Sequence, residues 1–149
     1  MRKSSRRSTR ANRSRPKWDP ALVRAHKRYV SAINSNKTNR VMACYDREAA
    51  IMQPDGPLVT GRRSIRKWVS DYFRTTKTHW DKVSKVMWVA GDYGFDQGVD
   101  SAVDRPRKGG PVARYTVKGI LIYKRQKNGE FLVYRDIWNY NSPPGLTRG

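Results

Sequence analysis

Asp136 is the acidic residue whose neighbours are best suited to acid–base chemistry. It alternates with Tyr134 and Trp138, and side chains two residues apart lie on the same face of a strand. An aromatic pocket around this carboxyl group would desolvate it and suit it to a role as general acid or base. The alternative is a structural acid that faces solvent or pairs across the sheet with a basic residue: Arg135, Arg114 or Lys118.

Three further aromatic residues, Tyr29, Trp68 and Tyr72, lie on predicted helix faces at the spacing of core residues. Packing in the core is the default interpretation of this spacing. The alternative is that they line a pocket together with Tyr134 and Trp138.

The remaining titratable side chains indicate structural roles. Asp96 and Asp100 are four residues apart on one strand face, which is about 13 Å by strand rise, so they cannot form a close carboxylate pair. Each is expected to form an ion pair with a nearby Lys or Arg. His26 and His79 have no obvious partner, and a surface or hydrogen-bonded role is expected for both. One cysteine, Cys44, and no His/Cys cluster exclude an internal disulfide and the common structural zinc sites. We expect no metal and no cofactor.

The chain is strongly basic, with 32 Lys and Arg against 12 Asp and Glu and a formal net charge of +20. Self-repulsion of that size disfavours the compact state unless a polyanion or salt offsets it. Eight basic and no acidic residues lie within residues 1–17: Arg2, Lys3, Arg6, Arg7, Arg10, Arg13, Arg15 and Lys17. Residues 1–18 are therefore expected to be a disordered arm that binds nucleic acid or another polyanion, and the alternative is a solvated tail with no partner.

More basic residues lie on the rest of the chain, which suggests an extended phosphate-binding surface. The predicted third helix begins with Arg62, Arg63, Arg66 and Lys67. A helix start offers free N–H groups as well as charge, which suits phosphate. No helix-turn-helix, zinc-finger or RNP-type signature is present, so we expect phosphate-dominated, salt-sensitive binding of low sequence specificity.

Apolar segments are too short for membrane insertion or secretion. The longest, near Gly119 to Tyr123, has about five residues, whereas a transmembrane helix needs roughly 20. No apolar region follows the N-terminal charges, which excludes a classical signal peptide. We expect the cytoplasm, the nucleus or a nucleoprotein particle, with a mitochondrial transit peptide as the alternative for residues 1–17.

Helices are predicted in the first half of the chain. Asp19–Pro20 is a typical helix start, and Asn34 to Asn36 stop that helix. Thr38 begins a short second helix that is expected to include Tyr45, and a brief strand follows over Ala49 to Met52. The third helix, after Gly61, has the clearest helical periodicity: Ile65, Trp68, Val69, Tyr72 and Phe73.

From Trp80 onward the hydrophobic period changes to 2, which predicts strands. Gly91–Asp92 marks a turn, Asp104 to Pro111 a flexible loop, and Asn128–Gly129 a hairpin. Residues 142–149 are expected to be a loose tail. The organisation is therefore an arm (1–18), one α+β domain (19–141) and a tail (142–149).

Six short segments carry a family resemblance: Arg28-Tyr29-Val30, Tyr45 to Ala50, Pro54-Asp55-Gly56, Gly61 to Ile65, Gly91 to Gly94, and Asn128 to Asn139. In order and spacing they resemble the nuclear-transport-factor-2-like superfamily, and within it the SnoaL-like and ketosteroid-isomerase-like branch. The resemblance implies an α+β cone, in which a curved antiparallel sheet wraps around N-terminal helices. It also implies a pocket at the wide end of the cone, no metal, and commonly a homodimer formed through the outer surface of the sheet.

The resemblance to the ketosteroid-isomerase branch is incomplete at the residues that do chemistry. Its carboxylate base precedes the proline of the strand after the second helix, and the matching residue here is Gln53, which cannot take a proton from carbon. Its second acid has no counterpart within Thr116 to Tyr123. Tyr29 matches the tyrosine that stabilises the oxyanion. Ketosteroid-type isomerisation is therefore disfavoured.

Two functions compete. The first is a protein that binds nucleic acid or another polyanion through its basic arm. It is expected to be a homo-oligomer and not an enzyme. The alternative is a cofactor-independent isomerase, dehydratase or cyclase, in which Asp136 and Tyr29 act on a small hydrophobic ligand in the cone.

Overall fold

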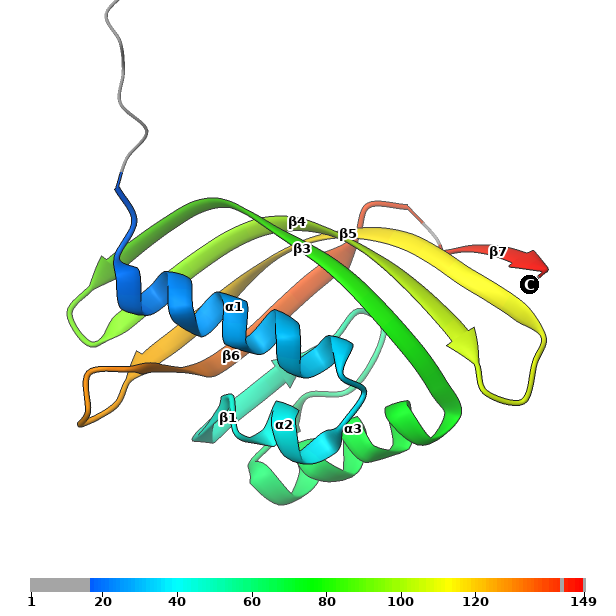
Figure 1. Cartoon of the computed structure of the whole chain (residues 1–149), viewed down its shortest axis with the longest axis horizontal. Coiled ribbons are helices and arrows are strands. Elements are labelled where there is room, and N and C mark those ends of the chain that lie inside the picture. Colours follow the sequence, from blue (N-terminus) through cyan, green and yellow to red (C-terminus); the bar gives the residue numbers. More distant parts are fainter. Residues whose placement is uncertain (1–16, 143, 149) are drawn as a thin grey trace, which may run out of the picture.

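The computed structural model describes residues 17–142 and 144–148. Within them, a curved sheet arches over three helices (Figure 1). This arrangement confirms the predicted α+β cone. The basic residues of the arm from Arg2 to Arg15 lie outside the described residues, and Lys17 is exposed.

The helices are α1 (Pro20–Asn34), α2 (Thr38–Met42) and α3 (Arg62–Thr75). The Asp19 carboxylate accepts hydrogen bonds from the N–H groups of Ala21 and Leu22 at 2.9 and 3.1 Å, which confirms the predicted start of α1. The second helix is shorter than predicted, because Tyr45 begins a strand instead of ending the helix. The helices bury their apolar stripes against the sheet: Leu22, Ala25, Tyr29 and Ala32 from α1, and Ile65, Val69 and Phe73 from α3.

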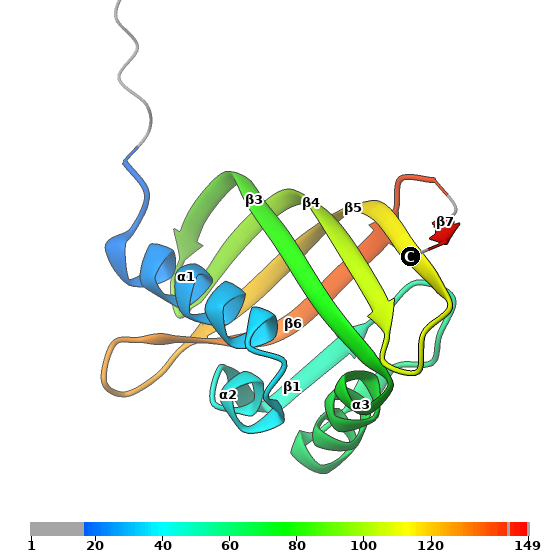
Figure 2. The same ribbon diagram turned by 45° about the vertical axis from the view of Figure 1, so that its right-hand side comes forward.

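The strands are β1 (Tyr45–Met52), β2 (Val59–Thr60), β3 (Thr76–Ala90), β4 (Tyr93–Pro106), β5 (Pro111–Arg125), β6 (Phe131–Tyr140) and β7 (Gly145–Arg148). Their order is β2-β1-β6-β5-β4-β3, with β7 paired to β5. The sheet is mixed rather than wholly antiparallel as predicted, because β1 runs parallel to β6 (Figure 2). Every other pair is antiparallel.

Two predicted loops are partly strand. The loop expected to begin at Asp104 begins after Pro106, because β4 continues through Asp104. The tail expected to be loose contributes β7. The turns at Gly91–Asp92 and Asn128–Gly129 are confirmed, with Gly91 and Gly129 in the left-handed region at φ values of 56° and 84°.

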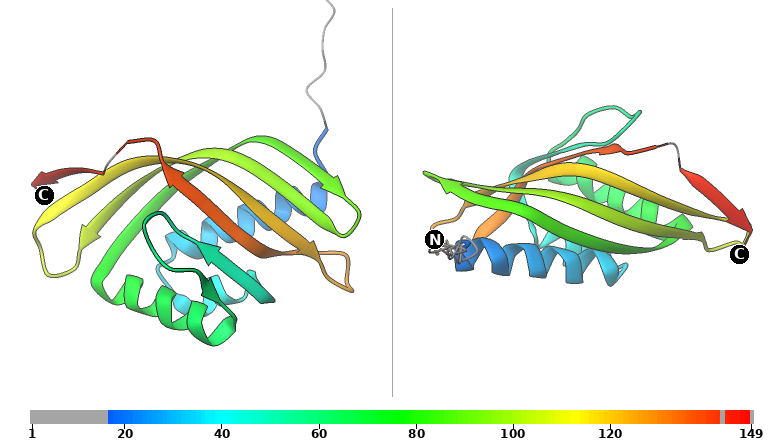
Figure 3. Two further views of the ribbon diagram at one scale, coloured as in Figure 1. Left: turned by 180° about the vertical axis from the view of Figure 1, so that it is seen from behind. Right: turned by 90° about the horizontal axis from the view of Figure 1, so that it is seen from above.

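Strand β4 turns its acidic and small side chains toward the helices and its large apolar side chains outward. Asp96 and Ala102 are buried on the concave face, whereas Val99 on the convex face is 42% exposed. A Cβ at Gly94 would lie 2.6 Å from the Leu22 side chain, so this glycine lets α1 pack directly on β4. In the described part of the chain, no helix covers the convex side of β3, β4 and β5 (Figure 3).

Candidate active site

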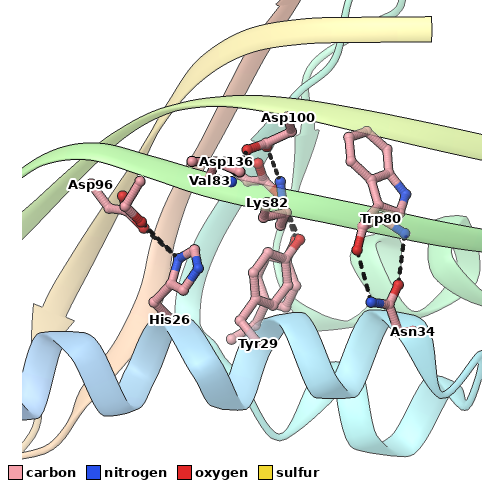
Figure 4. A network of polar contacts seen from close by, with 11 residues as sticks. His26, Tyr29, Asn34, Trp80, Lys82, Val83, Asp96, Asp100 and Asp136 are labelled. Carbon is pink, nitrogen blue, oxygen red and sulfur yellow. Dashed lines mark hydrogen bonds and ion pairs between the residues drawn. The ribbon is translucent and has the colours of Figure 1, made fainter.

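Asp136, on β6, is the centre of a buried cluster and is only 7% exposed. Its Oδ2 accepts hydrogen bonds from the hydroxyl groups of Tyr29 on α1 and Tyr45 on β1, at 2.7 and 2.8 Å. Figure 4 shows Tyr29 extending from α1 toward Asp136. The other carboxylate oxygen, Oδ1, has no hydrogen-bond partner among the described residues, and Asp136 lines the cavity described below. Oδ1 is therefore the oxygen that can still accept a hydrogen bond.

Burial keeps both tyrosines of this cluster protonated. Desolvation raises the pKa of Tyr29 and the pKa of Tyr45 well above the usual value, and the negative charge of Asp136 raises them further. Their hydroxyl groups are 3.1 Å apart, and their rings meet edge to face. Both phenols are hydrogen-bond donors at neutral pH and cannot act as bases.

A β-bulge in β6 decides which side chains join Asp136. Ile122 of β5 pairs with Arg135 and Tyr123 pairs with Val133, so Tyr134 is an extra residue without a partner position. The bulge breaks the alternation on which the prediction for Tyr134 depended. The Tyr134 ring is not part of the cavity lining, contrary to that prediction. Its centroid lies 3.7 Å from Cζ of the Arg135 guanidinium and 5.6 Å from the centroid of the tilted Tyr93 ring.

The Asp136 cluster opens into a cavity of about 240 Å³ between the sheet and the helices. The structure places four of the five predicted pocket aromatics around it: Tyr29, Trp68, Tyr72 and Trp138. The full lining is Tyr29, Ile33, Gln53, Pro54, Trp68, Tyr72, Trp80, Lys82, Asp104, Tyr115, Asp136, Trp138 and Tyr140. Such a mainly aromatic cavity with a few fixed polar groups is typical of a small-molecule site.

A second carboxylate cluster lies around Asp104, which the sequence had suggested belonged to a loop. Its Oδ1 accepts hydrogen bonds from Tyr72 at 2.7 Å and Thr78 at 2.5 Å, and its Oδ2 accepts one from Tyr115 at 2.8 Å. Desolvation raises the pKa of Tyr72 and the pKa of Tyr115, so these hydroxyl groups also donate. The alternation of β4 places Asp104 on the same face as Asp96 and Asp100. It would have identified Asp104, had the strand been predicted one residue longer.

Lys82, also missed at the sequence level, is the basic residue of the cavity wall. It lies opposite Asp100 in the β3–β4 register, and its Nζ is 2.5 Å from the Asp100 Oδ2. This ion pair confirms the expectation that Asp100 answers a basic residue. The Lys82 side chain is only 10% exposed, and its Nζ lies 4.7 Å from the centroid of the Trp80 ring.

Two polar links hold α1, and therefore Tyr29, against the sheet. The Asn34 side chain bonds both the backbone N–H and the carbonyl of Trp80, at 2.7 and 2.8 Å (Figure 4). His26 Nδ1 lies 2.7 Å from Asp96 Oδ2 and 3.2 Å from the Ser84 hydroxyl. His26 is thus a hydrogen-bonded structural histidine, as expected, and Asp96 pairs with it rather than with Lys or Arg. Asp96 and Ser84 share one ring nitrogen of His26, so the three do not form a nucleophile–base–acid relay.

Gln53 lines the cavity at the position where the family resemblance places a base. Its side-chain oxygen accepts a hydrogen bond from Trp68 Nε1 at 3.2 Å. An amide has no basic site for a carbon-bound proton, so Gln53 positions Trp68. Asp136 is left as the carboxylate with an available oxygen.

The four basic residues predicted to bind phosphate at the start of α3 are all exposed, but three of them make hydrogen bonds or ion pairs within the protein. Arg62 donates to the carbonyls of Tyr45 at 2.9 Å and Met42 at 3.2 Å. Arg66 donates to Asn39, and Lys67 pairs with Asp71 on the next turn. Arg63 is exposed and has no hydrogen bond within the described residues. Arg62 therefore joins α3 to the start of β1.

A broader basic surface lies beside the β5–β6 hairpin, in a shallow groove of about 780 Å³ that we call the hairpin groove. Its basic residues are Arg47, Arg62, Lys124, Arg125 and Lys127. Its one acidic lining residue, Asp46, accepts a hydrogen bond from Gln126 at 2.9 Å. The groove thus has a marked excess of positive charge.

Residues 17–142 and 144–148 contain no group of three His, Cys, Asp or Glu side chains placed to hold a metal ion. In the same residues, no helix is both long and apolar enough to cross a membrane.

Comparison with known proteins identifies the fold. No family model matches the sequence, and no curated protein is significantly similar to it. Among solved structures, a ketosteroid isomerase-like protein from Erwinia carotovora atroseptica is similar with a TM-score of 0.75 and 18% identity, over 83% of this chain and 95% of that one. A putative scytalone dehydratase from Novosphingobium aromaticivorans is similar with a TM-score of 0.73 and 14% identity, over 82% and 83% of the two chains.

A putative dehydratase from Streptomyces avermitilis, described as a member of the NTF2-like family, is similar with a TM-score of 0.67 and 13% identity, over 77% of this chain and 90% of that one. The TM-scores show that this chain shares its overall fold with these three proteins. The chain therefore has the fold of the nuclear-transport-factor-2-like superfamily, as the sequence segments suggested.

Proposed function

We propose that the cavity is the active site of a cofactor-independent isomerase, dehydratase or cyclase that acts on a small molecule. The Asp136 carboxylate carries this proposal: two tyrosine donors hold its Oδ2, and its Oδ1 is available in an aromatic cavity. A positioned carboxylate in such surroundings is suited to proton transfer. The descriptions of the similar structures, a ketosteroid isomerase-like protein and two putative dehydratases, support the same reaction class.

In this role Asp136 Oδ1 takes a proton from a carbon next to a carbonyl group. The protonated acid needs fewer donors than the carboxylate, so the Tyr29 hydroxyl becomes free to donate to the developing enolate oxygen. Asp136 then returns the proton, to a second carbon in an isomerisation or to a leaving hydroxyl group, which departs as water, in a dehydration. No electron acceptor is required for either step.

Solvent exchange tests the proposal even while the substrate is unidentified. A panel of small cyclic ketones and β-hydroxyketones is incubated with the protein in D₂O, and mass spectrometry records deuterium uptake and loss of water. We expect Asp136→Asn to lower the rate by about 10²-fold or more. Asp71→Asn, on the exposed side of α3, is the matched control and is expected to leave the rate unchanged. Equal rates for the wild type and Asp136→Asn would contradict the proposal.

Binding of nucleic acid or another polyanion is a second candidate function, favoured by the net charge of +20 and by the hairpin groove. If all eight charges of the arm met phosphates, the arm would add a slope of log affinity against log salt of up to about −7 on duplex DNA, or about −6 on single strands. Anisotropy titrations of labelled oligonucleotides at several salt concentrations test this with the full chain and with a chain lacking residues 1–17. Unchanged affinity after the deletion would argue against a role of the arm.

We also propose that the protein self-associates through the convex face of the sheet. An exposed apolar patch lies there, and exposed patches of this kind often mark interfaces. It comprises Val83, Val86, Trp88, Phe95 and Val99. Light scattering is expected to show a dimer for the wild type and a monomer for Trp88→Glu. A monomeric wild type would contradict this proposal.

A further inference from the structure

We propose that the cavity selects an organic ammonium ion, either a quaternary ammonium or a protonated amine, over neutral or anionic molecules of the same shape. The inference rests on the proposed function, because it names the substrate class of the same cavity. Two features carry it: an excess of buried negative charge, and walls that are mainly aromatic.

The charges that face the cavity do not balance. Of its thirteen lining residues, three have acidic or basic side chains: Asp104, Asp136 and Lys82. Lys82 is already neutralised by Asp100, at 2.5 Å. Within the described residues, neither Asp104 nor Asp136 has a basic partner, and each is held only by neutral hydroxyl groups. A cationic ligand would restore the balance, whereas an anionic ligand would meet two carboxylates.

The walls of the cavity are suited to the same kind of ligand. Seven of the thirteen lining residues are Tyr or Trp. Three of them form a row from the Asp136 cluster to the Asp104 cluster: Trp138 lies 6.3 Å from Trp68, Trp68 lies 5.7 Å from Tyr72, and Tyr72 donates to Asp104. The faces of such rings attract cations, and the attraction is strongest where water is excluded.

Lys82 already places an ammonium group in this environment. Its Nζ lies 4.7 Å from the Trp80 centroid and 5.9 Å from the Tyr29 centroid, and its charge is met by Asp100. The Asp104 end of the cavity has the same combination of rings and carboxylate, from Tyr72, Tyr115 and Asp104, but the protein supplies no cation there in the described part of the chain. A ligand ammonium would take the equivalent position.

The size of the cavity limits the ligand. Its volume of about 240 Å³ is below the roughly 300–1,000 Å³ of sites for drug-sized molecules, so the ligand is a small organic cation. The strongly basic exterior repels cations at long range, so the selectivity must arise inside the cavity rather than from electrostatic steering.

The test compares probes that differ in charge but not in shape. Choline and its uncharged carbon isostere, 3,3-dimethyl-1-butanol, are titrated into the protein by calorimetry, and benzoate serves as an anionic probe. We expect choline to bind at least tenfold more tightly than the isostere, and benzoate not to compete with it. Equal affinity of choline and its isostere, or tighter binding of benzoate, would overturn the inference.

Matched variants place the selectivity in the cavity. Asp104→Asn removes the charge but keeps the shape, and it is expected to lower choline affinity about tenfold, whereas Asp71→Asn on the exposed face of α3 is expected to change nothing. If Asp104→Asn melts early, Trp68→Leu replaces it, with Trp88→Leu on the convex face as its control. If a control variant lost as much choline affinity as its matched cavity variant, the inference would be overturned.

This experiment separates failure of the inference from failure of the proposed function. Deuterium exchange that depends on Asp136, without any preference for choline over its isostere, would contradict the ammonium inference and still support the proposed enzyme. The ketone panel is therefore extended to ketones that bear an ammonium group. Preference for choline without deuterium exchange on any of these ketones would support a binding cavity and contradict the proposed enzyme.

Discussion

The two carboxylate clusters of the cavity use the same residue types in different ways. Asp136 receives both tyrosine hydroxyls on Oδ2, so that Oδ1 has no partner in the described structure. Asp104 receives three hydroxyl donors spread over both of its oxygens. The Asp136 cluster draws its residues from α1, β1 and β6, and the Asp104 cluster draws its residues from α3, β3, β4 and β5.

This difference separates a group that can transfer a proton from a group that can only hold charge. A carboxylate with one oxygen fixed and the other available is oriented and still able to accept a proton. A carboxylate with both oxygens occupied is stabilised as an anion and has no free position for the reacting atom. We therefore expect chemistry at Asp136 and binding at Asp104.

The largest expected effect is a division between kcat and KM. Asp136→Asn should lower kcat about 10³-fold, because it removes the proton acceptor. Asp104→Asn should leave kcat nearly unchanged and raise KM about tenfold, because it removes an interaction that stabilises the bound substrate and the transition state equally. Steady-state kinetics on the substrate found by solvent exchange measures both. A larger fall in kcat for Asp104→Asn than for Asp136→Asn would reverse the assignment of the two clusters.

The hydroxyl donors should differ in their contribution to stability. Tyr45→Phe removes a donor to a buried carboxylate, which should lower the free energy of unfolding by about 2 kcal/mol. Tyr115→Phe acts at a half-buried position, with two other donors remaining on Asp104, and should cost about 1 kcal/mol. Urea denaturation of the two variants and of the wild type checks this order. Equal losses would show that the clusters are energetically equivalent.

Alkaline pH should destabilise both clusters. Burial raises the pKa of Tyr29, Tyr45, Tyr72 and Tyr115 in the folded protein. The stability that this provides is fully present below the unfolded pKa of about 10 and is lost as pH rises toward the folded values. Above that pH, each tyrosine that stays protonated in the folded protein lowers the free energy of unfolding by at most about 1.4 kcal/mol per pH unit. Tyr45→Phe should make the fall in unfolding free energy between pH 10 and 11 shallower, and an unchanged slope would contradict its burial.

The smallest expected effect concerns Tyr134, which the bulge removes from the Asp136 side of the sheet. Tyr134→Leu should change turnover by less than about twofold, because the ring lies outside the cavity and substitutions outside sites and cores usually have small effects. Trp138→Leu, two residues beyond Asp136 and inside the cavity, is the contrasting variant and should lower turnover clearly. A strong effect of Tyr134→Leu would mean that the ring reaches the substrate.

The site was predictable from the sequence only in part. Five predicted site residues do line one cavity: Asp136, Tyr29, Trp68, Tyr72 and Trp138. They could be predicted because helical periodicity and strand alternation show which side chains share a face. Tyr45 was assigned to a helix and Asp104 to a loop, and the ends of elements depend on tertiary pairing more than on local pattern. Lys82 carried no signal by itself, because its role depends on the residue opposite it in the next strand.

Local sequence was enough to predict the start of α1 at Asp19, the apolar stripe of α3 and the hairpin at Asn128–Gly129, and it singled out Asp136 as a candidate for acid–base chemistry. These features depend on residues close together in the chain. Three other features follow from the way the elements pair and pack: Tyr45 donates to Asp136, Lys82 pairs with Asp100, and Tyr134 lies outside the cavity. Register is the cause: a single extra residue in β6 reverses the alternation of its side chains, and its position is set by the pairing of β6 with β5 rather than by the pattern of β6 alone.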